Sequence, residues 1–279
     1  MTIDHYPERS RIVDENGDPF TTSNPLPVQE TSDPKDFMLE VPRGNISGIS
    51  CINKFGSNSV VDSGTTEDVW DGGGVYSFPA TATITHLRQA TDQVGTDGGA
   101  TIEVQGLDAS WDLTIQTADL DGTDTTTEVA LGTALIRVFR LKVNADVVLA
   151  DDIWVGATGV AAGTAKGLIL TPHNQTLMAI YTIPNGKTGY MTSYYCDFIE
   201  ATGKDPKSVG YRLWAADRDN SYEFQIKHEK GIPESASGFQ HEFRPYLKFT
   251  QKTDIKIDAN PDDKDVHVHA GFDLILVDN

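Results

Sequence analysis

The sequence has little positive charge for its length. Its 279 residues include 22 Lys and Arg against 41 Asp and Glu, which gives a formal net charge of −19. Such a surface repels nucleic-acid phosphates and anionic lipid headgroups, so we expect no direct nucleic-acid binding and no membrane association. The acidic residues are spread through loops and the N-terminal region, which favours a solubilising surface over a dedicated cation site.

Long hydrophobic segments are also missing. No run of 18 apolar residues occurs, which excludes a transmembrane helix of the usual length. The first nine residues, MTIDHYPER, lack the apolar core of a signal peptide. We therefore expect a protein that is made and kept soluble in a cytoplasm.

Cysteine is scarce, and the common enzyme motifs do not occur. Cys51 and Cys196 are the only cysteines and lack metal-ligand spacing, so we expect two buried free thiols, with a disulfide between them as the alternative. The glycines at 72–74 precede an expected strand and not a helix, which argues against a phosphate-binding loop. The sequence thus predicts neither an enzyme nor a bound cofactor.

Short segments with the pattern of β-strands are abundant. In residues 253–258, Ile255 and Ile257 alternate with charged residues, which predicts a strand with its charged face in water. Residues 266–276 alternate in the same way after a polar turn, so we expect an antiparallel hairpin, with residues 243–249 as a third strand.

Turn signals recur every ten to twelve residues or so through the middle of the chain, as in sandwiches and jelly rolls. We expect an all-β fold of the jelly-roll or β-sandwich type, either as two β-domains or as one large two-part sandwich. The expected divisions are an extended arm at 1–43, a first β-sandwich region at 44–158 and a second at 159–279.

The apolar pattern slips within the expected strand at 135–143. Ile136 and Val138 fall on one face, whereas Phe139 and Leu141 fall on the other. An extra residue in one strand produces such a change of face, so we expect a bulge here or a bend between sheets.

The N-terminal 43 residues contain six of the thirteen prolines and few apolar side chains, which predicts an extended arm. Such an arm is either a tail without a partner or a docking strap. A stiff, polyproline-like stretch favours the strap and supplies the expected partner-docking residues. These are Asn24, Pro25, Leu26, Pro27 and Val28.

Two further groups are candidates for contacts or ligands. The segment 175–183 is apolar on both faces, which is typical of a central or covered strand, and Leu177, Met178, Ile180 and Tyr181 are candidates for an interface between copies. His267 and His269 share one strand face and could ligate a metal with Asp265 or Asp273, although an exposed pair without metal is the simpler interpretation.

Several segments together carry a resemblance to a known family. They are Gly44–Gly56, Glu67–Gly74, Ile102–Asp108, Ile136–Arg140, Asn174–Pro184 and Ala270–Asn279. Across residues 44–279 the chain resembles virion structural proteins of tailed bacteriophages. The resemblance does not assign a place on the particle.

The resemblance implies a virion component assembled in the host cytoplasm. We expect a head decoration or cement protein that is anchored by its arm to the major capsid protein and forms a dimer or trimer with itself. A tail, collar or baseplate protein is the alternative within the same class. From another class, a carbohydrate-binding adhesin would use Trp111, Trp154 and Trp214, although large aromatic residues in sandwiches are more often core residues.

Overall fold

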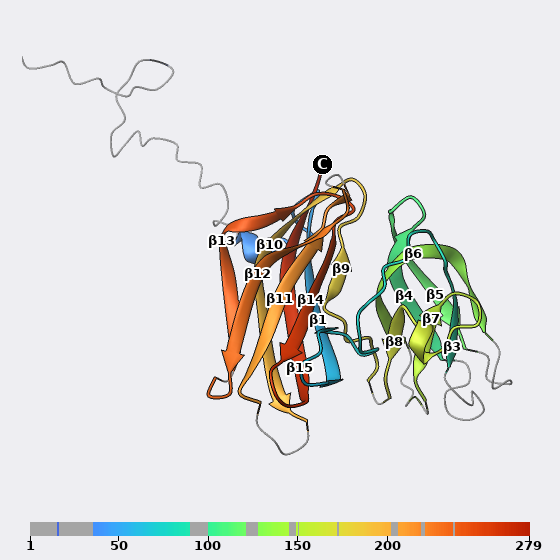
Figure 1. Ribbon diagram of the computed structural model, residues 1–279. Helices are drawn as coiled ribbons and strands as arrows, with labels where there is room; N and C mark the ends of the chain where they lie inside the picture. The colour runs from blue at the N-terminus through green and yellow to red at the C-terminus, as the bar shows by residue number, and fades with distance from the viewer. Residues whose placement is uncertain are drawn as a thin grey trace, which may run out of the picture. The chain divides into compact units, whose positions relative to one another are not determined.

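The computed structural model describes residue 16 and residues 36–89, 100–120, 128–144, 149, 151–171, 173–201, 206–218, 221–236 and 238–279 (Figure 1). The chain divides into two compact units, Met1–Asn45 and Ile46–Asn279. In the first unit, helix α1 spans Phe37–Glu40, and the Asp36 carboxylate caps it by accepting a hydrogen bond from the Met38 amide at 3.0 Å. A short helical turn therefore lies within the segment for which the sequence predicted an extended arm.

The second unit confirms the prediction of an all-β fold. Its described residues include antiparallel strands and the 3₁₀ turn η1 (Ala162–Thr164). The strands are β1 (Ile49–Val61), β2 (Glu67–Asp68), β3 (Ile84–Gln89), β4 (Thr101–Asp108), β5 (Leu113–Asp119), β6 (Val129–Val143), β7 (Ile153–Gly156), β8 (Gly167–Ile169), β9 (Ile180–Thr182), β10 (Lys187–Glu200), β11 (Ser208–Ala216), β12 (Phe224–Pro233), β13 (Phe239–Phe249), β14 (Asp254–Pro261) and β15 (Val266–Asp278).

Two of the three sheets form a β-sandwich. One has the strand order β1-β15-β10-β13, and the other has the order β12-β11-β14-β2, with β9 also paired to β14. Apolar side chains from both sheets share one core, in which Phe272 and Met191 of the first sheet belong with Tyr211 and Ile257 of the second. This core is the reason that the strands keep alternate residues out of water.

The third sheet has six strands in the order β5-β4-β6-β3-β7-β8 and a core of its own (Figure 1). Ile84, Ile102, Leu141 and Ile153 come from four different strands of this sheet and lie in one buried cluster. A single sheet encloses side chains from its own strands in this way only when it curls.

Strand pairing does not follow the chain order. β1 pairs antiparallel with β15, from Ile49 opposite Val277 to Val61 opposite Val266. The pairing of β7 with β8 also crosses the expected division between residues 158 and 159. The sandwich therefore contains strands from both ends of the second unit, while the six-stranded sheet takes its strands from the middle.

The hairpin predicted near the C-terminus is wrong. β14 pairs with β11, whereas β15 pairs with β1 and β10 in the other sheet. The residues of β13 likewise pair with β10. The turn after β14 carries the chain from one layer of the sandwich to the other, a connection that the alternation of apolar residues does not distinguish from a hairpin.

The bulge expected within 135–143 is confirmed in β6. The partner of Gln105 is Arg140 but the partner of Gly106 is Val138, which leaves Phe139 as an extra residue. The expected faces are corrected by this shift, because Ile136 and Phe139 lie in the sandwich core while Val138 and Leu141 lie in the core of the six-stranded sheet. β6 thus contributes to both cores.

Within the part of the chain that the structure describes, no helix is long and apolar enough to cross a membrane.

Candidate functional site

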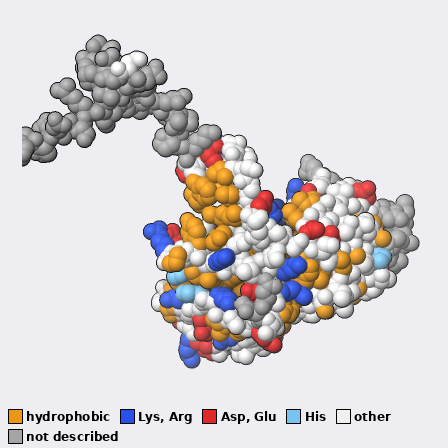
Figure 2. All heavy atoms as spheres, turned by 90° about the horizontal axis from the view of Figure 1, so that it is seen from above, with side chains coloured by type: hydrophobic (Ala, Val, Ile, Leu, Met, Phe, Trp, Pro, Cys, Tyr) orange, Lys and Arg blue, Asp and Glu red, His pale blue; other side chains and the backbone are white. Residues whose placement is uncertain are grey.

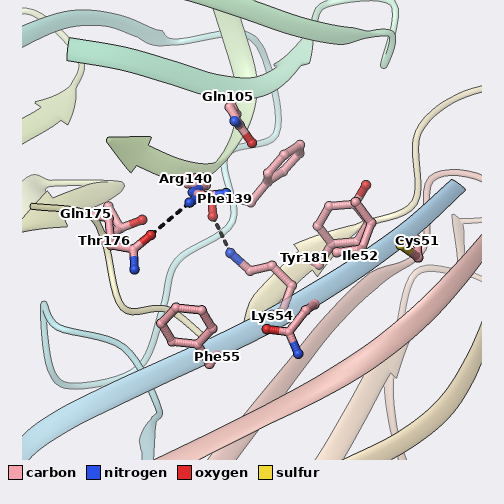
Figure 3. Close-up of a pocket in the computed structure, with 11 residues that line it drawn as sticks. Cys51, Ile52, Lys54, Phe55, Gln105, Phe139, Arg140, Gln175, Thr176 and Tyr181 are labelled. Atoms are coloured by element: carbon pink, nitrogen blue, oxygen red, sulfur yellow. Dashed lines mark hydrogen bonds between the residues drawn. The ribbon is translucent and has the colours of Figure 1, made fainter. Parts of the chain in front are cut away.

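A pocket of about 370 Å³ lies between β1 and β6 (Figure 3). Its side chains come from three parts of the chain, namely β1, the strands β4 and β6, and the segment 175–181. The lining includes Cys51, Lys54, Phe55, Phe139, Arg140 and Gln175. Because β6 bulges at Phe139, Phe139 and Arg140 both line the pocket although they are neighbours in the strand.

Lys54 is the central polar side chain of the pocket. It is 7% exposed, and its ammonium group donates a hydrogen bond to the backbone carbonyl of Phe139, which Figure 3 marks with a dashed line. Burial, together with the positive charge of Arg140, lowers the pKa of Lys54 to about 7. No carboxylate among the described residues forms an ion pair with this amine.

Amide side chains complete the polar part of the lining. Arg140 Nη2 donates to Gln175 Oε1 at 2.9 Å, a contact that fixes the position of the guanidinium group. Gln105 donates to Glu103 at 2.7 Å, and Asn53 donates to Asp273 at 2.6 Å. Glu103 and Asp273 thus fix the positions of the two amide side chains, but neither acid lines the pocket itself.

The two cysteines are free, as expected, and they differ in exposure. Cys196 is buried in the sandwich core, and burial raises the pKa of its thiol to about 12. Cys51 is exposed and lines the pocket, so the prediction that both thiols are buried is wrong for Cys51. The Cys51 side chain lies on the face of β1 that points away from the core. The isoleucines of this segment do not alternate regularly, so the sequence did not reveal which face is buried.

The predicted histidine pair lies on β15 with ring centroids 4.4 Å apart. His267 Nε2 lies 2.7 Å from Ser57 Oγ, and His269 Nδ1 lies 2.8 Å from Asp197 Oδ1. Both rings therefore have partners within the sheet. Among the described residues, no group of three His, Cys, Asp or Glu side chains is arranged to hold a metal ion.

The apolar residues predicted as an interface between copies lie mostly inside the chain. Met178, Ile180 and Tyr181 are each no more than 2% exposed, and Leu177 is half-buried. Tyr181 packs on Phe139 with a ring separation of 4.7 Å. Neighbouring parts of the same chain therefore cover these three residues.

The tryptophans considered as sugar platforms occupy different environments. Trp111 is 8% exposed and lies beneath the Arg137 and Arg218 guanidinium groups, 4.8 and 4.2 Å from its ring centroid. Trp154 and Trp214 are half-buried on separate sheets. The three rings do not form one platform. The docking residues predicted at 24–28 lie outside the described residues.

Sequence reasoning missed a set of buried charges on β14. Asp254 and Asp258, which were expected to face water, are 0% and 4% exposed. Lys256 forms an ion pair with buried Asp68 at 2.8 Å, and Trp214 Nε1 donates to Asp258 at 2.7 Å. Burial raises the pKa of Asp258 to about 6. Their partners lie far away in the sequence, so the alternating pattern alone could not reveal these contacts.

No protein-family model matches the chain, and comparison with curated proteins finds no match.

Proposed function

We propose that this protein is a structural component of a tailed-phage virion, most specifically a head decoration or cement protein anchored by its N-terminal region. The resemblance of residues 44–279 to phage virion proteins supports this assignment. The all-β architecture is compatible with it, since a particle component requires a stable folded body and surfaces for neighbours, not a catalytic centre.

The observation that carries the anchoring part of the proposal is the surface of helix α1. Phe37, Met38 and Leu39 are three consecutive large apolar residues that are 42%, 60% and 46% exposed. Contiguous exposed apolar side chains are characteristic of surfaces that bind another protein. Because this helix lies in the same unit as the proline-rich segment, we propose that the two form a single docking element.

Exposed apolar side chains also occur elsewhere, among acidic and basic groups, on the face shown in Figure 2. Leu113 and Ile115 are 50% and 59% exposed on β5, an edge strand of the six-stranded sheet. These two side chains lie outside the proposed docking element and therefore provide a matched control for the α1 residues.

The test compares incorporation of variants into phage particles. We expect deletion of residues 1–43, and substitution of Phe37, Met38 and Leu39 by Ser, to reduce the copies per particle at least about tenfold, which corresponds to about 1.4 kcal/mol of binding energy. Substitution of Leu113 and Ile115 by Ser should retain the anchor. Circular dichroism of the purified variants establishes that the β-body is folded.

Separate quantification in heads and tails locates the protein on the particle. Its presence in tail-less heads supports the head assignment, whereas its presence only in tails identifies a tail, collar or baseplate protein. A folded deletion variant that incorporates at full occupancy would overturn the anchoring role, and absence of the protein from purified virions would overturn the structural role itself. Binding to host glycans without any presence in virions would identify the adhesin instead.

A further inference from the structure

The charge of the β1–β6 pocket is opposite to that of the whole protein. Acidic residues outnumber basic residues by 41 to 22 in the chain. The residues that line the pocket nevertheless include two basic side chains, Lys54 and Arg140, and no Asp or Glu. Pockets of this size that bind small molecules combine an apolar wall with a few convergent polar groups. The lining has the composition of a site for a negatively charged ligand.

The donors of the pocket are only partly used within the protein. Lys54 has three N–H donors, and the structure shows one hydrogen bond from them, to the Phe139 carbonyl. Arg140 has five donors and makes one described hydrogen bond, to Gln175. A buried ammonium group without a counter-charge is costly, and a bound anion would reduce that cost. The two cations thus leave donor capacity for a ligand at the polar side of the pocket.

The remaining wall of the pocket is apolar and aromatic. Phe139 and Tyr181 are packed against each other, and Phe55 and Ile52 lie on β1 beside Lys54. Figure 3 shows these rings around the Lys54 side chain. Phe139 and Tyr181 are only 4% and 1% exposed, so Phe55, which is 37% exposed, and the half-buried Ile52 are the apolar surface that a ligand with an apolar body would cover.

The local balance of charge favours a single negative charge on the ligand. The pKa of Glu103 is lowered mainly by the hydrogen bond that Gln105 donates to its carboxylate, and the positive charge of Arg140 makes a smaller contribution. Asp273 is held by Asn53 just behind the lining. These two acids offset part of the positive charge, so a dianion such as phosphate is disfavoured relative to a monoanion.

We propose that the β1–β6 pocket binds a small organic monocarboxylate, that is, one carboxylate group on an aromatic or aliphatic body. The carboxylate accepts hydrogen bonds from Lys54 and Arg140, as charge-assisted pairs of this type favour. The body packs on Phe55 and Ile52, with the buried Phe139 and Tyr181 rings behind them. This inference does not depend on the virion assignment, because it rests only on the chemistry of the pocket.

Cys51 provides a direct readout of occupancy, since it is the exposed cysteine and lines the pocket. The rate of its reaction with the neutral reagent N-ethylmaleimide is measured on the full chain, with Cys51→Ser as the control for labelling elsewhere. The probes are phenylacetate, its neutral analogue phenylacetamide, and inorganic phosphate. Saturation-transfer NMR on the same probes detects binding that leaves the thiol accessible.

We expect phenylacetate to slow labelling of Cys51 in a saturable manner and to show saturation transfer, with phenylacetamide and phosphate binding at least about tenfold more weakly. Lys54→Met and Arg140→Gln should each weaken phenylacetate binding at least about tenfold. Arg244→Gln, which changes an exposed arginine outside the pocket, should not. Thermal unfolding of each variant reports whether it is folded. If Lys54→Met does not fold, Arg140→Gln still tests the proposal.

The proposal is overturned if phenylacetate gives neither protection nor saturation transfer at up to about 1 mM. It is also overturned if phenylacetamide binds as well as phenylacetate, or if both folded variants bind like the wild type. Tighter binding of phosphate than of phenylacetate would reject the carboxylate assignment in favour of a plain anion site.

Discussion

Arg137 of β6 and Asp254 of β14 form a buried, bidentate ion pair. Arg137 Nε lies 2.8 Å from Asp254 Oδ1, and Nη2 lies 2.7 Å from Oδ2, with both side chains at most 2% exposed. Thr182 and Tyr222 also donate to the same carboxylate. The pair therefore connects the six-stranded sheet to the sandwich through a fully hydrogen-bonded cluster.

Removal of one partner of this pair should be strongly destabilising. We expect Asp254→Leu or Arg137→Met to lower the free energy of unfolding by about 3–5 kcal/mol, because each leaves an uncompensated buried charge or donor set. The double variant should be less destabilised than the sum of the two single changes. Urea unfolding of the four proteins measures this coupling. Additive effects of the two changes would show that the pair does not act as a unit.

Much of the fold could be predicted from the sequence, because period-two patterns mark most strands directly. The strands expected at 135–143 and 266–276 lie within β6 and β15. Pairing could not be predicted in the same way. β1 and β15 are separated by nearly the whole second unit, and nothing in either pattern specifies that they pair.

The site was predictable only in part. The slip in the apolar pattern around Phe139 did indicate the bulge that places Phe139 and Arg140 in the pocket. Lys54, by contrast, lies in a segment interrupted by glycines, and a lone lysine in a strand ordinarily faces water. Its burial depends on β6 and on the segment 175–181, which are packed against it only in the folded chain.

Asp71 should make the protein less stable as pH rises through the acidic range. Burial, together with the negative charge of Asp152, raises the pKa of Asp71 to about 7, although the Leu177 amide donates to its carboxylate at 2.9 Å. Between about pH 4 and pH 7 the folded state therefore keeps a proton that the unfolded state has released, so stability falls as pH rises through this window.

Asp71→Asn removes this titration while retaining an oxygen that can accept from the Leu177 amide. We expect the free energy of unfolding of the variant, relative to that of the wild type, to increase by roughly 2–4 kcal/mol from pH 4 to pH 8. Urea unfolding at each pH measures this difference. His173 Nδ1 lies 3.9 Å from the Asp71 carboxylate. Because His173 is present in both proteins, the difference between their unfolding free energies reports the change at Asp71. Asp62→Asn, at an exposed position, serves as the control and should show no comparable change. A pH-independent difference for Asp71→Asn would contradict the prediction.

Lys54 should have the opposite dependence at higher pH. Its pKa is lowered to about 7 in the folded state from an ordinary value of 10.5. Between about pH 7 and pH 10 the unfolded state binds a proton that the folded state does not, so this group makes stability rise with pH. Below about pH 7 both states are protonated and the full cost of the buried charge is present.

Lys54→Met should therefore be more stable than the wild type at pH 6, by roughly 2–4 kcal/mol after loss of the hydrogen bond to Phe139. The advantage should shrink progressively towards pH 10. Urea unfolding at pH 6, 8 and 10 measures the difference. Lys227→Met on β12, outside the pocket, is the control. A difference in stability that does not change with pH would mean that the pKa of the Lys54 amine is not lowered in the folded state.

Gly56 of β1 should tolerate no side chain, because the segments around residues 69 and 179 cross directly over it. A Cβ atom at Gly56 would collide with the backbone oxygen of Val69 and the backbone nitrogen of Ala179, which are themselves hydrogen-bonded to each other at 2.9 Å. Backbone atoms in a bonded pair cannot yield as a flexible side chain can. We expect Gly56→Ala to lower the free energy of unfolding by about 3 kcal/mol.

Gly231 of β12 is the matched control, since a Cβ atom there would meet no atom within 4 Å. Gly231→Ala should be neutral or should stabilise the protein by up to about 1 kcal/mol, because alanine reduces the conformational freedom of the unfolded chain. Urea unfolding of both variants at one pH decides the matter. Equal effects of the two substitutions would show that the crossing over β1 is looser than the close approach at Gly56 requires.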